Sequence, residues 1–227
     1  MRVKKPQAAL QRRLTAIYEI LSQTYPTYEE SGDPWMTNGL SATPFRHLVS
    51  GCLSTMTLTK RVINACVPLY ARVSTFEELL ALDDDELRDI IRPVAHYNRK
   101  TVNLKAMCRQ IIEGHGGEIP QTREQVMELQ GVGRKVADLV MNHLNAQDSI
   151  AVDSHVLRVL RRLAIVTDTT AEAAADTIGM LTPSGYKRHA HEWLIQLGMH
   201  VCHVRKPDCP DCVVRSLCPF GTDPSVS

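Results

Sequence analysis

The sequence is poor in aromatic residues and lacks any long apolar run. Phe, Trp and Tyr make up 5% of the 227 residues, and the alternating pattern of β-strands is weak throughout. No apolar stretch approaches the roughly 20 residues that a membrane-spanning helix needs. The net charge is +1, so overall charge does not predict nucleic-acid binding. Any such function must rest on local groups.

We also expect the chain to carry no secretory address. Its first residues, MRVKKPQAALQRRL, lack the apolar core and small-residue cleavage site of a signal peptide. We therefore expect a cytoplasmic protein, associated with the nucleoid if the source is bacterial, in a compartment where thiols stay reduced. A hydrophobic content of 44% and a charged content of 22% are typical of one or two globular domains. We expect a monomer with no membrane partner.

Helical periodicity is present along most of the chain and predicts an all-α fold. Apolar residues Leu10, Leu14, Ile17 and Leu21 recur at helical spacing within residues 7–22. Residues 24–44 are rich in turn formers and predict a connecting loop. Residues 45–69 predict two further helices, and another is predicted to begin after Ser74 as its cap, with Glu77 three residues later. The acidic run at 83–85 predicts the start of a helix. A last helix is predicted over 98–115, with Gly116 or Gly117 as its C-cap.

Four cysteines lie close together near the C-terminus. Cys202, Cys209, Cys212 and Cys218 have the spacing Cys-x6-Cys-x2-Cys-x5-Cys. A reducing compartment disfavours disulfides, and the polar surroundings of this segment offer little apolar core. Structural burial instead suits the isolated Cys52, Cys66 and Cys108. Thiolates hold either zinc or a 4Fe–4S cluster, and the spacing alone leaves both open.

A glycine pair precedes a second informative segment. Gly131 and Gly133 stand directly before a helical run with Val136, Leu139, Val140 and His143 on one face. Glycines permit a turn with positive φ, and the bared N–H groups at a helix N-terminus can bind a phosphate. A plain turn between two helices is the alternative for these glycines taken alone.

Together these motifs resemble the endonuclease III branch of the helix–hairpin–helix DNA glycosylases. The carrying residues are LQGVGRK at 129–135, VDSH at 152–155 and the four cysteines, in the family's order, and the resemblance runs from about Phe45 to Phe220. It implies a 4Fe–4S cluster rather than zinc. It also implies two helical domains with a DNA-binding cleft between them: a six-helix domain at 36–147 with the hairpin, and an iron–sulfur domain at 1–35 plus 148–227.

The resemblance assigns catalysis to Lys135 and Asp153. A lysine nucleophile must be uncharged, and a position in the first turn of a helix disfavours a second positive charge. Such an amine can attack deoxyribose and form a Schiff base. Asp153 would stabilise positive charge on the sugar. It is also placed to cap the helix that follows, and both roles can hold.

DNA contacts are expected at three places: the hairpin, the loop between the first two cysteines, and two residues that would fill the gap left by a flipped nucleotide. The hairpin residues are Gln130, Gly131, Val132, Gly133 and Arg134. Arg205 and Lys206 lie between the first two cysteines, where a loop anchored at both ends would direct them at backbone phosphates. A solvated basic turn is the alternative reading of that pair.

The two residues expected to fill the gap left by a flipped nucleotide depart from the family pattern. Met56, in LSTMT, stands where relatives carry a glutamine, and His96, in AHYN, stands where they carry a leucine. The predicted function is a bifunctional glycosylase and AP lyase that acts on oxidised pyrimidines and abasic sites in duplex DNA. The alternatives are a monofunctional adenine-type glycosylase, against which Lys135 argues, and a weakly catalytic DNA-binding relative.

Overall fold

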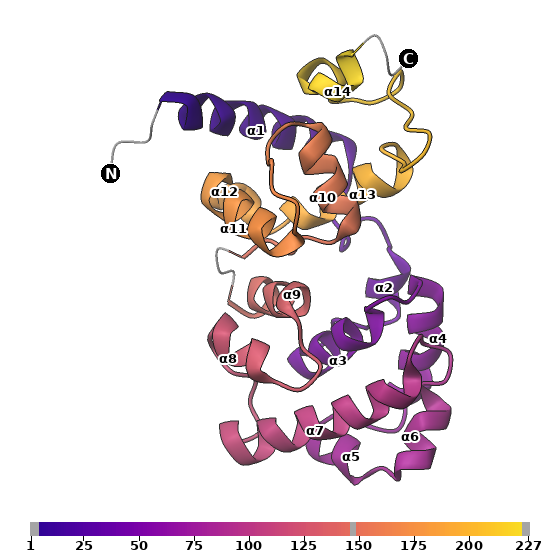
Figure 1. Ribbon diagram of the computed structural model, residues 1–227. Coiled ribbons are helices and arrows are strands. Elements are labelled where there is room, and N and C mark those ends of the chain that lie inside the picture. The colour runs from indigo at the N-terminus through magenta and orange to yellow at the C-terminus, as the bar shows by residue number, and fades with distance from the viewer. Residues whose placement is uncertain (1–4, 146–148, 224–227) are drawn as a thin grey trace. The chain divides into compact units, whose positions relative to one another are not determined.

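The computed structural model describes residues 5–145 and 149–223, and all regular elements in these ranges are helices (Figure 1). The predicted all-α class is therefore confirmed. The chain divides into two compact units. We call Gly32–Leu144 the continuous unit, and Met1–Ser31 with Asn145–Ser227 the discontinuous unit.

The continuous unit is built around one long helix, α7. Helices α3, α5 and α6 pack against α7, while α2 and α6 pack against α4 (Figure 1). Several of its helices are only one or two turns long, which is too short to show a period in the sequence. The helices are α2 (Pro34–Thr37), α3 (Pro44–Ser54), α4 (Thr59–Tyr70), α5 (Phe76–Ala81), α6 (Asp84–Ile90), α7 (Tyr97–His115), α8 (Arg123–Glu128) and α9 (Arg134–Asn145).

Capping residues explain where several of these helices begin and end. Asp83 caps α6 with its carboxylate on two N–H groups, and Gly116 ends α7 in the left-handed conformation with φ 62°, as predicted. The predicted cap of α5 is displaced by one residue: Thr75, not Ser74, accepts from the Glu78 amide. Ser74 instead donates its N–H and hydroxyl to the Glu78 carboxylate, so this carboxylate binds the residue before the Thr75 cap.

The residues predicted as a plain loop contain the short helix α2. Asp33 accepts a hydrogen bond from the Trp35 amide, and Pro34 occupies the first helical position. Proline is favoured there because its fixed φ suits a helix and its missing N–H is not needed. The turn-rich composition predicted a loop and did not predict this single helical turn.

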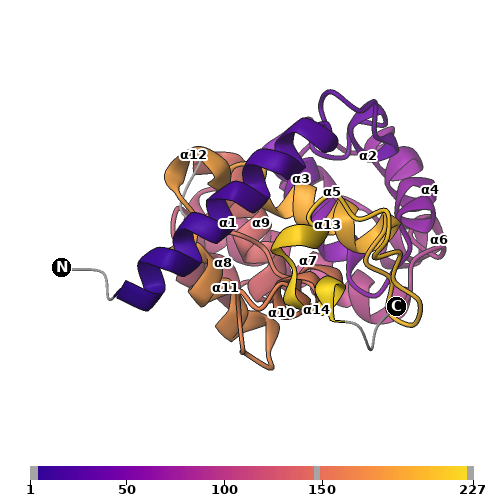
Figure 2. The same cartoon turned by 90° about the horizontal axis from the view of Figure 1, so that it is seen from above.

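The discontinuous unit joins the N-terminal helix to the C-terminal third of the chain. Its longest helix, α1, contacts α11 and α13, and α10 contacts α11, α13 and α14. Figure 2 shows α1 along its length as a nearly straight rod. The elements are α1 (Lys5–Thr24), α10 (Ser154–Arg162), α11 (Ala171–Leu181), α12 (Ser184–Lys187), α13 (Ala190–His200), the 3-10 turn η1 (Arg215–Leu217) and α14 (Pro219–Thr222).

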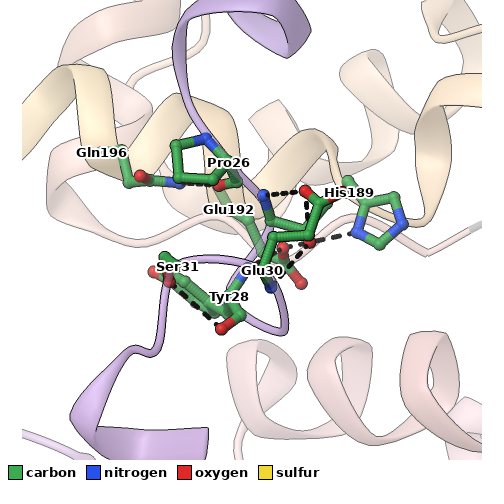
Figure 3. A network of polar contacts seen from close by, with 8 residues as sticks. Pro26, Tyr28, Glu30, Ser31, His189, Glu192 and Gln196 are labelled. Atoms are coloured by element: carbon green, nitrogen blue, oxygen red, sulfur yellow. Dashed lines mark hydrogen bonds and ion pairs between the residues drawn. The ribbon is translucent and has the colours of Figure 1, made fainter.

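Polar contacts join the segment after α1 to α13. The Tyr28 amide donates to the Glu192 carboxylate at 3.0 Å, and the same carboxylate lies 3.3 Å from Nδ1 of His189 (Figure 3). Gln196 donates to the Pro26 carbonyl at 3.1 Å. These bonds attach the N-terminal segment to a helix more than 160 residues away in the sequence, so the two parts form one unit.

Candidate active site

The hairpin between α8 and α9 is a tight turn that requires one of its two glycines. Gly131 has φ 81°, and a Cβ at this position would lie 2.8 Å from Nδ2 and 2.9 Å from Cβ of Asn103. Gly133 has no positive φ, and a Cβ there would meet nothing within 4 Å. The expectation of positive φ holds for Gly131 only. Gly133 leaves its backbone open to the surroundings.

Side chains of α7 hold the hairpin in place. The Gln130 amide donates to Oε1 of Gln110 at 2.7 Å, and Nε2 of Gln130 donates to Oδ1 of Asn103 at 3.3 Å. The Val132 amide donates to the Leu129 carbonyl at 3.0 Å. The Val132 side chain is buried in the core.

Lys135 is the second residue of α9 and is half-buried. The preceding Arg134 donates from Nε to Oδ2 of the buried Asp138 at 2.7 Å. Nη1 of Arg123, from α8, lies 3.7 Å from Oδ1 of Asp138. A buried carboxylate thus holds both basic residues beside the start of α9. The apolar face of this helix also differs in detail from the prediction: Val136, Ala137, Val140 and Met141 are buried, whereas Leu139 and His143 are half-buried.

Met56 and His96 lie on the wall of one cavity of about 180 Å³. Gln130 and Gly131 of the hairpin line the same cavity, as does Lys100. Four of the residues selected from the sequence therefore come together in the continuous unit. Both Met56 and His96 are exposed, and both have left-handed backbones, with φ 54° and 57°. Left-handed non-glycine residues are uncommon and concentrate at functional sites.

Asp153 caps α10 in the discontinuous unit. Its Oδ1 accepts the His155 amide at 2.9 Å and the Val156 amide at 3.0 Å. The predicted capping role is confirmed. Two N–H donors and the positive end of the helix dipole stabilise the negative charge of this carboxylate.

The last of the four C-terminal cysteines, Cys218, ends η1 and caps α14. Burial raises the pKa of the Cys212 thiol, and the thiols of Cys218, Cys202 and Cys209 act in the same direction. The Gly221 amide donates to Sγ of Cys218 at 3.3 Å. Among the described residues, no set of three or more His, Cys, Asp and Glu side chains is arranged to hold a single metal ion. Cys52, Cys66 and Cys108 are buried as predicted.

Arg162 organises the loop between the first two of these cysteines. Its guanidinium donates to Sγ of Cys202 at 3.2 Å, to the His203 carbonyl at 2.6 Å and to the Val204 carbonyl at 2.9 Å. Arg205 and Lys206 follow directly and are exposed. The loop thus presents both basic side chains to solvent from a fixed base.

Some contributing residues escaped sequence reasoning. Arg158 and Arg162 were not among the residues selected from the sequence. Arg158 donates to the carbonyls of Cys202 and Gly198, at 2.9 and 2.7 Å. Lys100 and Asn103 belong to no motif, and only the fold reveals that they support the hairpin and the cavity. Lys100 follows His96 by four residues, and its amide donates to the His96 carbonyl at 3.0 Å.

Comparison with known proteins identifies the protein family to which this chain belongs. Residues 49–183 match the family described as HhH-GPD superfamily base excision DNA repair protein. Because this match covers more than half of the chain, the protein belongs to that superfamily and is a DNA glycosylase of base excision repair.

Its relatives narrow the assignment to one branch, and the chain belongs to the endonuclease III family. It is 34% identical to endonuclease III of Haemophilus influenzae over 177 residues, which cover 78% of this chain and 84% of the relative. It is 32% identical to the Escherichia coli K12 enzyme over 179 residues, 79% of this chain and 85% of the relative. The resemblance seen in the sequence is thereby confirmed.

Solved structures agree with the sequence comparison. A trapped endonuclease III–DNA covalent intermediate superposes with a TM-score of 0.82 at 26% identity, over 93% of this chain and 96% of that chain. A non-covalent endonuclease III–DNA complex matches with the same values. Within the described residues, no helix is both long and apolar enough to traverse a bilayer.

Proposed function

We propose that the protein is a bifunctional DNA glycosylase and AP lyase that removes oxidised pyrimidines and nicks abasic sites. The observation that carries the proposal is the position of Lys135, a half-buried residue at the start of the helix after the Gly131–Gly133 hairpin. The similarity to an endonuclease III trapped covalently on DNA supports it. We further propose that the protein acts as a monomer on duplex DNA.

In the proposed reaction, the Lys135 amine attacks C1′ of the damaged nucleotide. The bond between C1′ and the base breaks, and the base leaves with the bonding electrons and takes up a proton. The bond between C1′ and O4′ then breaks, O4′ takes the electron pair and a proton from solvent, and the nitrogen of Lys135 forms a protonated Schiff base with C1′. Loss of a proton from C2′ allows the bond between C3′ and its phosphate oxygen to break, and this elimination nicks the strand.

Asp153 supplies the negative charge that this reaction needs. Positive charge develops on the sugar as the base leaves, and a preorganised carboxylate stabilises it without changing its own protonation. The two amides that hold Oδ1 of Asp153 fix the orientation of the group. The proposal requires that Lys135 and Asp153 both reach the same deoxyribose.

DNA recognition would rest on three groups of residues. The amides of Gly131 and Gly133 bind a backbone phosphate at the N-terminus of α9, and Gly133 leaves room for that approach. Arg205 and Lys206 bind phosphates from the loop that Arg162 anchors. Met56 and His96, on the wall of one cavity, fill the space that the everted nucleotide leaves.

The four cysteines fit a 4Fe–4S cluster as thiolate ligands. Soft sulfur donors bind iron–sulfur clusters, and the N–H groups of Gly221 and Arg162 are directed at two of the sulfur atoms. When bound, the cluster would cross-link the loop of Arg205 and Lys206 to η1 and α14. Iron and sulfide analysis of the purified protein tests this assignment, with about four of each per chain expected.

A panel of lesion-bearing duplexes tests the function. Base release and strand nicking are scored separately on oxidised pyrimidines, on adenine opposite a damaged guanine and on abasic sites. We expect release of oxidised pyrimidines together with nicking. Release of adenine without nicking would favour a monofunctional enzyme, and inactivity on every duplex would favour a DNA-binding relative.

A further inference from the structure

Helix α7 carries two buried lysines that serve as hydrogen-bond donors inside the continuous unit. Lys100 is 8% exposed and Lys105 is 9% exposed. Nζ of Lys105 donates to the carbonyls of Leu80 and Leu82, at the end of α5. Nζ of Lys100 donates to the carbonyls of Leu53 and Thr55, both at 2.8 Å, at the end of α3. Each lysine therefore satisfies carbonyls that a helix C-terminus leaves unpaired.

The two lysines differ in what the capped segment carries. Beyond α3 the chain turns through Thr55, Met56 and Thr57, and Lys100 binds on both sides of Met56. Besides the Thr55 carbonyl, its Nζ lies 3.2 Å from Oγ1 of Thr57. The left-handed Met56 thus sits between two acceptors of one ammonium group.

The same contact reaches the loop of His96. Oγ1 of Thr57 also accepts the amide of Ala95 at 3.1 Å, and Ala95 directly precedes His96. Thr57 thus connects the two loops, and Lys100 binds that connection from α7. Because non-glycine residues disfavour positive φ, both left-handed residues need such support from their surroundings.

We propose that Lys100 is a positioning residue that fixes Met56 and His96 in the geometry needed to occupy the gap beside an everted nucleotide. This inference rests on the proposed function, in which these two side chains fill that gap. Burial lowers the pKa of Lys100 to about 8, which fits an internal donor rather than a solvated contact to phosphate. Lys100 acts through the two loops and touches no reacting atom.

The test compares matched lysine variants. Lys100→Met keeps the length of the side chain and removes the donor, and Lys105→Met makes the same change five residues away on the same helix. Thr57→Val removes the link between the loops without altering a buried charge, so it remains informative if Lys100→Met does not fold. The affinity of each variant is measured for an intact duplex and for one with a tetrahydrofuran abasic analogue opposite 2-aminopurine.

Lys100→Met and Thr57→Val should lower the preference for the abasic duplex by about tenfold, since preorganisation of the inserted residues is lost. The fluorescence rise of 2-aminopurine, which reports disturbance of the orphan base, should fall in the same variants. Affinity for the intact duplex should stay within about twofold, because phosphate contacts dominate it. Lys105→Met should behave as wild type in all three measurements.

Three results distinguish failure of the positioning role from failure of the proposed function. Wild-type preference and fluorescence in both Lys100→Met and Thr57→Val would overturn the positioning role while leaving the proposed function intact. An equal loss in Lys105→Met would also overturn it, because general destabilisation would then explain the effect. A wild-type protein without any preference for the abasic duplex would instead contradict the proposed function itself.

Discussion

Replacing Gly131 by alanine should destabilise the hairpin for two reasons that can be separated. The φ of 81° places a non-glycine residue in the left-handed region, at about 1–2 kcal/mol. The new Cβ would lie 2.8 Å from Nδ2 of Asn103, and overpacking of this kind costs about 1–3 kcal/mol. Together the loss is roughly 2–5 kcal/mol, or roughly 5–15 °C in Tm for a chain of this size.

Tryptophan fluorescence can follow this unit by itself. The chain has two tryptophans, and Trp35 belongs to the continuous unit, so a Trp193→Phe background leaves one reporter. Urea unfolding in this background measures the loss in Gly131→Ala. Gly133→Ala is the matched control and should cost less than about 1 kcal/mol, since its Cβ meets nothing.

A second substitution distinguishes the clash from the backbone strain. Asn103→Ala removes Nδ2 and Cγ but keeps Cβ, which would lie 2.9 Å from the new Cβ. It should therefore recover only part of the clash, about 1 kcal/mol, in the Gly131→Ala background while the strain remains. Gly131→Ala at wild-type stability would refute the reasoning. Equal losses in Gly131→Ala and Gly133→Ala would also refute it.

Three further predictions concern Asp153, Arg162 and Lys100. Asp153→Asn should keep the free energy of unfolding within about 0.5 kcal/mol of wild type, because Asn caps helices equally well. The same variant should slow single-turnover base release about 10²–10³-fold. Release at the wild-type rate would exclude a catalytic role for the charge of Asp153. Arg162→Met should loosen the loop of Arg205 and Lys206 and lower the slope of log K against log salt for duplex binding by about 1–2; an unchanged slope would exclude that anchor. Burial lowers the pKa of Lys100 to about 8 from a reference of 10.5, so the unfolded state binds the proton more tightly than the folded state. The stability that Lys100 contributes should therefore rise with pH between these two values. The free energies of unfolding of wild type and Lys100→Met, measured in urea, should diverge across that window, and a constant difference would contradict the shift.

Much of the fold could be predicted because its signals are local. The helix start at Asp83 and the end at Gly116 depend on a cap within a few residues of sequence. The α5 cap was predicted one residue early, at Ser74, because Ser74 and Thr75 are both good caps and the sequence could not choose between them. Burial of Phe76 against the core settles the choice.

The supports of the candidate site could not be predicted, because they depend on contacts between distant segments. Position 131 must be a glycine partly because a Cβ there would clash with Asn103, 28 residues earlier in the chain. Lys100 donates to carbonyls 45 and 47 residues away. Arg162 reaches the carbonyls that follow Cys202, some 40 residues later. A sequence motif marks where chemistry can occur, whereas these long-range hydrogen bonds appear only once the chain is folded.

Borohydride trapping on an abasic duplex tests the central role of Lys135 most directly. Borohydride reduces the Schiff base to a stable amine, so the wild-type protein should become covalently linked to the DNA, with the adduct mapped to Lys135. Lys135→Ala should form no adduct, while Lys60→Ala, which alters an exposed lysine of the same unit, should react as wild type. An undiminished adduct in Lys135→Ala, or none in the wild type, would contradict the proposed mechanism.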